Sequence, residues 1–406
     1  MKQLNFEPGK NLLLRWAGVK DILPKEVFWL DLRSKVKQMI KQVLEYSLNK
    51  ELEAILKAER YQHCELREGY RNGYRSRSLV THIAGRIDNF LVPRARRKVK
   101  FKLIKAYQRR LDEFDYAILN CFLNGQSTRK TAKFFYDFFS ESNISHQTVS
   151  NILKRLDGVV NSFLKKRITD DYLFLIVDAK YIKITPQNKR KRPVLFCIGI
   201  REDLTYQVLY FKVASSENEI NYTNFFFELK EKGLEGNNLK MLISDDKKAI
   251  ENAFLFVYPD KDIQICCVHY VREALTYIKN KKLLPYIRKK TYNLYKSKTK
   301  SEFLNKLNTF KKEYQNKEPK FFNILLKNID KTLTFYKYPA KFHSLIKSTN
   351  LIERFLRDIE QLTRYWAGFR DEKSANRVIY LLVERFNKNR NFNYGGLSLY
   401  EFTHFC

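Results

Sequence analysis

The chain has 406 residues, and its 77 lysines and arginines against 44 aspartates and glutamates give a formal net charge of +33. A hydrophobic fraction of 44% with 15% aromatic residues excludes a mainly disordered protein, and no stretch approaches the roughly 20 apolar residues of a membrane span. The length predicts about two to four domains, and the charge predicts a polyanionic partner, foremost a nucleic acid.

The six cysteines are scattered along the chain, which indicates reduced thiols rather than a disulfide framework. The amino terminus lacks the apolar core of a signal peptide. We therefore expect a cytoplasmic protein with no membrane partner, associated with the nucleoid when it is bound to DNA.

The first part of the chain predicts a helix followed by a basic arm. Residues 25–60 have apolar side chains at helical spacing. Residues 67–110 contain 14 lysines and arginines against two acids, and their alternation and glycines predict short hairpins or an irregular arm. A charge run is most often a solvated face, but the interleaved Tyr70 and Tyr74 favour contact with DNA.

Residues 112–160 predict three short helices, with Ser127 and Ser145 as N-caps of the second and third. This spacing suits a helix-turn-helix, and an ordinary three-helix bundle is the alternative. In the first interpretation the last helix presents five polar side chains to a DNA groove: His146, Gln147, Ser150, Asn151 and Lys154.

From residue 170 the pattern changes to strands and then to alternating strands and helices. Strands are expected at 172–184, 193–200, 205–214, 239–244 and 262–268, and helices at 218–233 and 247–257. This order predicts an α/β layer with a mixed sheet. Residues 276–345 are expected to be helical, with 18 lysines and arginines against 4 acids, and 346–388 to form one or two long helices.

Three acidic residues indicate a metal site. Asp178 and Asp245 each close an apolar run, and Glu353 lies within Ser348–Arg354. A carboxylate at the end of a buried strand is costly unless a metal or another partner compensates its charge. Mg²⁺ prefers a few carboxylate oxygens together with waters and phosphates, and two such ions can activate the attacking oxygen and stabilise the leaving oxygen in phosphodiester chemistry.

The residues around these acids match a known pattern over roughly residues 30–395. The matching motifs are, in chain order, Gly69–Arg75, Val92–Arg94, Asn124–Arg129, Ser145–Ser150, Val177–Lys183, Ser244-Asp245, Cys266–Arg272, Ser348–Arg357 and Phe369–Tyr380. With these motifs the chain resembles the mutator-type transposases of bacterial insertion sequences, a DDE family.

The resemblance implies a ribonuclease-H-like α/β fold. Its mixed β-sheet is flanked by helices and interrupted by an all-α insertion, and a mainly helical DNA-binding region precedes it. The implied domains are an N-terminal helical and basic arm region for DNA binding or dimerisation (1–110), a helix-turn-helix domain (111–168), the first part of the catalytic core (169–275), the all-α insertion (276–345) and the C-terminal helices that carry the glutamate (346–406).

For the site, the resemblance implies that Asp178, Asp245 and Glu353 are catalytic and hold two Mg²⁺ ions, for which Mn²⁺ substitutes. Asp245 is preferred to Asp246 because the acid of the family directly follows the serine.

A Cys-x-x-His motif follows the second acid. We expect Cys266 and His269 to support the active site by packing and hydrogen bonding. A zinc site that also uses Cys267 is the alternative, and it lacks an evident fourth ligand.

The expected partner is double-stranded DNA, both the transposon ends and the target, bound by a homodimer. The expected DNA contacts are Arg71, Arg75, Arg94, Arg96, Arg97, Arg129, Gln147, Ser150, Lys154, Arg288, Lys289, Lys290, Arg354, Arg357 and Arg364. One departure stands out: Glu360 occupies a position, seven residues after Glu353, where the family usually has a basic residue.

The expected function is therefore that of a transposase, which binds terminal inverted repeats and carries out strand cleavage and strand transfer. A DNA-binding protein derived from a transposase, with reduced or no strand transfer, is the alternative that Glu360 favours. A ribonuclease-H-like nuclease directed by RNA is a third, weaker interpretation.

Overall fold

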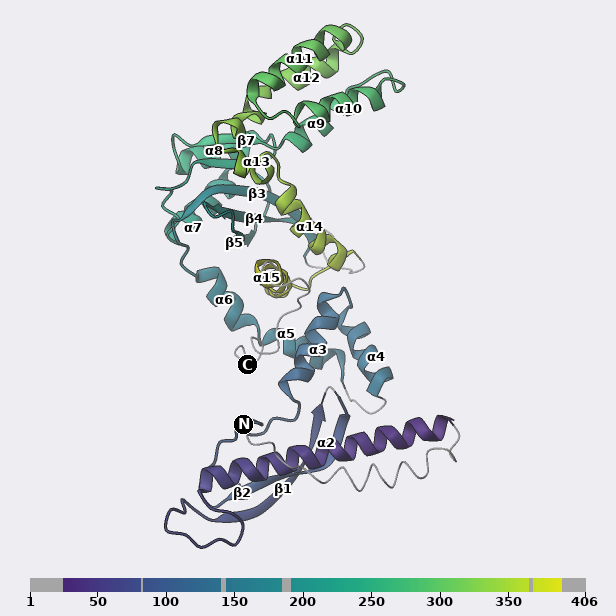
Figure 1. Cartoon of the computed structure of the whole chain (residues 1–406), viewed down its shortest axis with the longest axis vertical. Helices are drawn as coiled ribbons and strands as arrows, with labels where there is room; N and C mark the ends of the chain where they lie inside the picture. Colours follow the sequence, from purple (N-terminus) through teal and green to yellow (C-terminus); the bar gives the residue numbers. More distant parts are fainter. Residues whose placement is uncertain (1–24, 82, 140–143, 185–190, 365–367, 389–406) are drawn as a thin grey trace. The chain divides into compact units, whose positions relative to one another are not determined.

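The computed structural model describes residues 25–81, 83–139, 144–184, 191–364 and 368–388 (Figure 1). These residues fall into two compact units that divide between Arg155 and Leu156. Each unit has hydrophobic core residues of its own.

The first unit begins with a long helix packed on a β-hairpin. Helix α2 (Lys25–Leu56) lies along strands β1 (Arg71–Thr81) and β2 (Gly85–Ala95), which pair antiparallel (Figure 1). Apolar residues from both elements form the core between them: Leu48, Leu79, Ile87 and Phe90. The predicted helix and hairpin are confirmed.

Three short helices complete the first unit: α3 (Asp112–Leu123), α4 (Thr128–Phe139) and α5 (His146–Lys154). All three pack against one another. The hydroxyl of Ser145 accepts a hydrogen bond from the Thr148 amide at 3.1 Å, and that of Ser127 accepts one from Lys130 at 3.3 Å. The predicted helices and N-caps are confirmed. Each serine oxygen satisfies a backbone amide that the first turn of its helix leaves unpaired.

The second unit contains a five-stranded sheet in the order β5-β4-β3-β6-β7. Its strands are β3 (Tyr172–Lys183), β4 (Lys191–Arg201), β5 (Tyr206–Val213), β6 (Met241–Ser244) and β7 (Asp262–Ile265). The first three pair antiparallel, whereas β6 and β7 run parallel to β3. The predicted mixed sheet is confirmed, and β3 lies at its centre.

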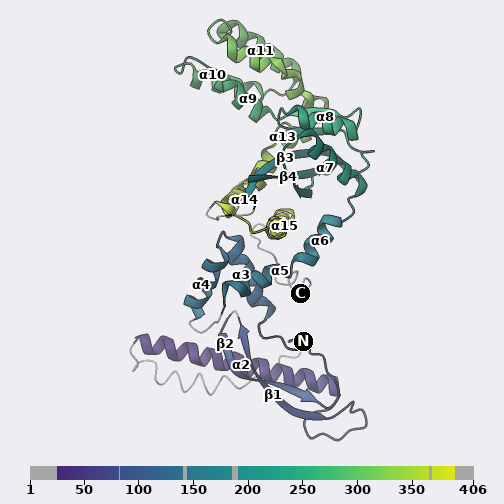
Figure 2. The same ribbon diagram turned by 180° about the vertical axis from the view of Figure 1, so that it is seen from behind.

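Helices cover both faces of this sheet (Figure 1, Figure 2). Helices α7 (Glu219–Glu231) and α8 (Lys248–Val257) pack on the face formed by alternate residues of β3, among them Leu175 and Val177. The opposite face packs against α13 (Ala340–Ile346), α14 (Asn350–Thr363) and α15 (Glu372–Lys388), through the ring pairs Phe174–Phe342, Phe196–Phe355 and Tyr206–Phe386. Helix α6 (Asp157–Lys165) also packs on α15.

Between β7 and α13 the chain is helical, as predicted. It forms α9 (Cys267–Thr276), α10 (Leu284–Leu294), α11 (Lys300–Tyr314), α12 (Pro319–Lys327) and the short 3₁₀ helices η1 (Ile329–Thr332) and η2 (Thr334–Lys337). Their shared core includes Phe303, Phe310, Phe321 and Phe322, and it also takes in α9. Among the helices of the described ranges, none is both long and apolar enough to cross a membrane.

Candidate active site

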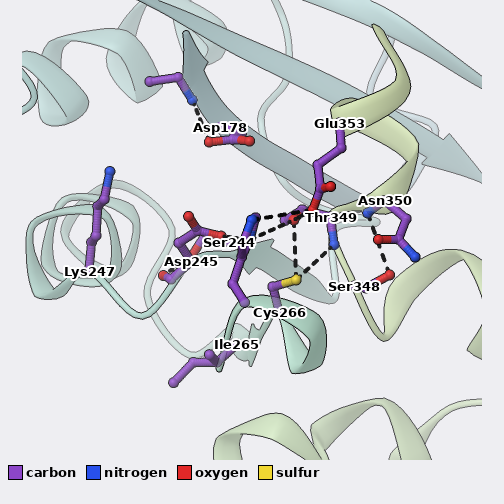
Figure 3. A network of polar contacts seen from close by, with 12 residues as sticks. Asp178, Ser244, Asp245, Lys247, Ile265, Cys266, Ser348, Thr349, Asn350 and Glu353 are labelled. Carbon is purple, nitrogen blue, oxygen red and sulfur yellow. Dashed lines mark hydrogen bonds and ion pairs between the residues drawn. The ribbon is translucent and has the colours of Figure 1, made fainter. Parts of the chain in front are cut away.

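The sheet register brings the first two acids together. Ile176 of β3 pairs with Ile243 of β6, and these strands run parallel. Asp178 and Asp245 each lie two residues further along, so they are level with each other on neighbouring strands. Asp178 lies within β3, which continues to Lys183, whereas Asp245 directly follows the end of β6. Side-chain alternation places Asp178 on the same face as Phe174, which is the face that α13 and α14 cover. Glu353 approaches from the first turn of α14 (Figure 3).

Asp178 is the acid whose charge is most costly in this setting. Burial raises the pKa of Asp178 to about 7, and the neighbouring charge of Asp245 adds to this rise. The amide of Ala179 donates a hydrogen bond to Oδ1 at 2.7 Å and lowers the pKa in part. Like charge in a partly buried site favours a cation near the two carboxylates.

His269 of α9 bridges the other two acids. Its Nδ1 lies 2.5 Å from Oδ1 of Asp245, and its Nε2 lies 3.3 Å from Oε1 of Glu353. The contact with Asp245 is the main cause that raises the pKa of His269 to about 10. The imidazolium therefore fixes the spacing of two carboxylates that come from different elements.

Cys266 joins the start of α14 to the ends of the parallel strands. Its amide donates to the carbonyl of Ser244 at 2.8 Å, and its buried Sγ accepts from the amide and the hydroxyl of Thr349 at 3.3 and 3.2 Å (Figure 3). Thr349 precedes Glu353 by one helical turn, and its hydroxyl lies 3.5 Å from Oε1 of that residue. The Cys266 thiol thus contacts Thr349, which in turn holds Glu353.

The ligand atoms of Asp245, Cys266 and His269 all lie within 4.8 Å of one another. Cys267, which the zinc alternative requires, is instead packed in the helical core of α9 to α12, where burial raises the pKa of its thiol to about 12. The Cys266–Cys267–His269 set is therefore not brought together in this structure.

The residues fit a hard divalent cation better than zinc. Three carboxylates lie around one site: His269 contacts both Asp245 and Glu353, and the charge of Asp245 acts on Asp178. Carboxylate oxygens are the ligands that Mg²⁺ and Mn²⁺ prefer.

Two neighbouring acids have other partners. Asp246 is exposed, and its Oδ2 accepts a hydrogen bond from the side-chain amide of Asn328 at 2.9 Å. Glu360 of α14 forms an ion pair with Lys180 of β3, with 2.6 Å between Oε2 and Nζ.

Most of the residues predicted to contact DNA are exposed. These are Arg75, Arg94, Arg96, Arg129, Gln147, Lys154, Arg288, Lys289, Arg354, Arg357 and Arg364, whereas Ser150 is half-buried. Three of the predicted residues have acidic partners: Arg71 pairs with Glu53 of α2 at 3.2 Å, Arg97 with Glu68 at 3.1 Å, and Lys290 with Glu313.

Two residues near the acids were missed by the sequence reasoning. Lys247 forms an ion pair with Glu217, and its charge acts on Asp178. Thr349 bonds both Cys266 and Glu353. The signals were present: Lys247 closes Ser244-Asp245-Asp246-Lys247, and Thr349 stands four residues before Glu353.

Comparison with known proteins shows the family of the chain. The model of the family described as "Transposase, Mutator family" matches residues 28–394. The chain belongs to the Mutator family of transposases. The resemblance found in the motifs is thus confirmed over most of the chain's length.

Relatives of this Mutator-family chain include transposases of several insertion sequences. It is 27% identical over 375 residues to the transposase for insertion sequence element ISRM5 of Rhizobium meliloti (strain 1021), which covers 92% of this chain and 91% of the relative. It is 29% identical over 329 residues to the transposase for IS256 in transposon Tn4001 of Staphylococcus aureus, which covers 80% of this chain and 83% of the relative.

Among solved structures, the Drosophila P element transposase strand transfer complex is similar over 73% of this chain and 82% of that chain. The identity is 12% and the TM-score is 0.28, which is too low to carry an argument about this Mutator-family chain.

Proposed function

We propose that this chain is a DNA transposase that binds the terminal inverted repeats of its insertion sequence and cleaves and joins DNA strands through Asp178, Asp245 and Glu353. The observation that carries the proposal is the convergence of these acids. They are separated by 67 and 108 residues in the sequence and come from β3, the end of β6 and α14. The relatives named above, which are transposases for insertion sequences, support it.

The three carboxylates would hold Mg²⁺ or Mn²⁺, which supplies Lewis-acid activation of the attacking oxygen and stabilises the leaving oxygen. His269 keeps Asp245 and Glu353 at a fixed spacing, and Cys266 and Thr349 fix the first turn of α14. Such preorganisation matters because small displacements of reacting groups lower the rate steeply.

The reaction has two steps, and both exchange one phosphorus–oxygen bond for another. Water first attacks a phosphodiester at the transposon end, the bond to the 3′ oxygen breaks, and that oxygen takes up a proton. The 3′-OH then attacks a phosphodiester of the target, where a 3′ oxygen leaves with the proton. Because water and then the DNA 3′-OH are the nucleophiles, and a DNA oxygen is the leaving group in both steps, no covalent bond between protein and DNA forms.

The same proposal assigns the parts of the fold. The sheet order and its mixed strand directions support a ribonuclease-H-like core. Helices α3 to α5 recognise the repeat, and the basic hairpin and the helical insertion at 276–345 hold the backbone. Because α6 packs on α15, we place the end of the recognition domain at the break after Arg155 rather than at 168. A homodimer brings two ends together.

Single substitutions of the acids test the catalytic assignment. We expect Asp178→Ala, Asp245→Ala and Glu353→Ala each to abolish cleavage of repeat-containing DNA in the presence of Mg²⁺ or Mn²⁺, because each removes a ligand oxygen. End binding, measured by gel shift, should persist, since the surface charges that hold DNA are unchanged.

Asp246→Ala is the matched control, because it removes an adjacent carboxylate that bonds Asn328. This variant should keep its activity. An active Asp245→Ala beside an inactive Asp246→Ala would show that the wrong carboxylate was chosen. Activity in all three variants of the triad would refute the proposed mechanism.

A further inference from the structure

A basic cavity in the first unit lies outside the carboxylate site. It has a volume of about 470 Å³, and the segment 105–112, α3 and the end of α5 line it. Four positive and two negative side chains face it: Lys105, Arg109, Arg110, Arg155, Asp112 and Asp115. Its wall therefore keeps an excess of positive charge.

The backbone fixes this cavity to both the hairpin and the helices. The amide of Val80 in β1 donates to the carbonyl of Arg109 at 2.9 Å, and the amide of Leu111 donates back to Val80 at 2.9 Å. The segment that carries Arg109 and Arg110 is thus held on the hairpin. Arg155 follows the last residue of α5 and forms its C-cap.

Asp115 of α3 holds the two arginines together. The residue is 2% exposed, and each carboxylate oxygen has its own guanidinium: Oδ1 accepts from Nε of Arg110 at 2.9 Å and Oδ2 from Nη1 of Arg155 at 2.8 Å. Two cations on one carboxylate leave a net positive charge. In the described part of the chain, the remaining N–H groups of both guanidiniums have no other acceptor.

Stability alone explains this arrangement poorly. Burial raises the pKa of Asp115, and the charges of Arg110 and Arg155 oppose that rise, so the carboxylate depends on both arginines. Buried ion pairs of this kind contribute little net stability compared with apolar packing. A second acid, Asp112, similarly holds Lys105, with 3.4 Å between Nζ and Oδ2.

We propose that this cavity binds a backbone phosphate of DNA, with Arg110 and Arg155 as its donors, Lys105 as an added charge, and Asp115 as the residue that positions the arginines. Guanidinium groups suit a phosphate because their planar N–H donors match its oxygens. A phosphate held here is contacted from the hairpin segment and from the end of α5 at once, so it fixes the register of both on the duplex. The inference rests on the proposed function, since it names a contact to the DNA that function requires.

Salt dependence of DNA binding tests the proposal. Arg155→Gln should lower the slope of log affinity against log salt by about 0.9, because it removes one charge from a phosphate contact. Lys105→Gln should lower the slope by a smaller amount, because Asp112 already pairs with Lys105. Affinity for repeat DNA and for unrelated DNA should fall by the same factor, since phosphate contacts carry no sequence information. Lys212→Gln is the control, because Lys212 pairs with Glu228 on the α7 face of the sheet; its slope should match that of the unaltered protein.

Asp115→Asn separates positioning from simple electrostatics. The substitution makes the cavity more positive, so electrostatics alone predicts tighter binding of DNA. Loss of the contacts that position Arg110 and Arg155 predicts weaker binding, and this is the result we expect. The measurement is made well below the melting temperature of the variant. Tighter binding would overturn the role of Asp115.

The outcomes for the cavity and for the proposed function are distinct. An unaltered protein that binds no DNA would refute the proposed function. Normal binding with unchanged slopes in Arg155→Gln and Lys105→Gln would refute only the cavity. Lys105→Gln leaves the Asp115 contacts intact, so it remains informative if Arg155→Gln folds poorly. Stabilisation by inorganic phosphate that Arg155→Gln abolishes, together with unchanged slopes for DNA binding, would assign the cavity to a free anion and overturn the DNA contact.

Discussion

Asp178 shows how a residue that we propose to be catalytic can lower stability. Its carboxylate lies beside that of Asp245, and burial and like charge together raise its pKa from 3.8 to about 7. Since the pKa is raised in the folded state, ionisation lowers stability as the pH rises from about 4 to about 7. At pH 8 without metal, ionisation of Asp178 lowers the free energy of unfolding by up to roughly 4 kcal/mol. This figure is an upper bound, because the site is partly exposed to solvent.

We therefore expect Asp178→Asn to raise the free energy of unfolding of the metal-free protein by roughly 1 to 3 kcal/mol at pH 8, since the amide keeps the shape and removes the charge. The same variant should lose cleavage and the stabilisation that Mg²⁺ gives. Denaturant unfolding with and without Mg²⁺ measures both effects. A variant less stable than the unaltered protein at pH 8 would contradict the repulsion inferred here.

Glu360 is the residue that departs from the family pattern, and its contacts suggest what it does. It pairs with Lys180, two residues after Asp178, and the charges of Arg364 and Arg357 also act on it. The contact with Lys180 lowers the pKa of Glu360, so the carboxylate is charged at neutral pH. It neutralises the positive charge of Lys180, two residues from Asp178.

Glu360→Gln should strengthen DNA binding and steepen the dependence of log affinity on log salt by about 0.9, because one more cation becomes available to phosphate. Glu372→Gln is a matched control, since Glu372 is also an acid paired with an arginine, Arg192, at 3.1 Å. Faster strand transfer in Glu360→Gln would show that Glu360 restrains the enzyme. Unchanged binding would leave Glu360 with a structural role only.

At the scale of elements, the insertion at 276–345 combines its own aromatic core with a basic surface. Arg288 and Lys289 of α10 are exposed, whereas Lys290 forms an ion pair with Glu313 and lies 4.9 Å from the ring centre of Tyr314. The three neighbouring charges are therefore not equally available to a phosphate.

We expect replacement of Arg288, Lys289 and Lys290 together by glutamine to flatten the salt dependence of DNA binding by about two units and to slow strand transfer. Lys290→Gln alone should change the slope little, because Glu313 already neutralises that lysine. Filter binding over a range of salt concentrations measures both variants. A triple variant with an unchanged slope and normal circular dichroism would assign the insertion to structure.

At the scale of the whole molecule, the boundary between Arg155 and Leu156 separates two proposed roles. The first unit recognises the repeat, and the second cleaves and joins DNA strands. Helix α6 belongs to the second unit, where Asp157 accepts two hydrogen bonds from Arg377 of α15 at 2.5 and 2.8 Å. A truncation that removes α6 would therefore expose part of α15.

A fragment that begins at Leu156 should lose the preference for inverted repeats and keep weak, salt-sensitive affinity for any DNA, because α3 to α5 are gone and the basic insertion remains. Competition between repeat and unrelated duplexes measures the preference. A fragment that begins at residue 166 is the comparison, and we expect it to be less stable. Equal preference in the fragment from Leu156 and in the full chain would refute recognition by α3 to α5.

The sequence by itself determined the elements and the residue types of the site. Helical spacing in 25–60, serines before two helices and apolar runs in 172–214 are local signals, because a residue's immediate neighbours decide propensity and capping. Asp178 and Asp245 were recognisable because each ends such an apolar run. Family motifs then supplied the order of the acids along the chain.

Only the tertiary structure decided which charged groups meet. The register of Ile176 with Ile243 aligns the two aspartates, and α9 places His269 between Asp245 and Glu353. The tertiary structure likewise pairs Arg71 with Glu53, and it brings Arg110 and Arg155 together on Asp115. These partners lie up to 84 residues apart in the sequence. An ion pair leaves no periodic trace there, because its energy depends on distance and burial in the folded chain.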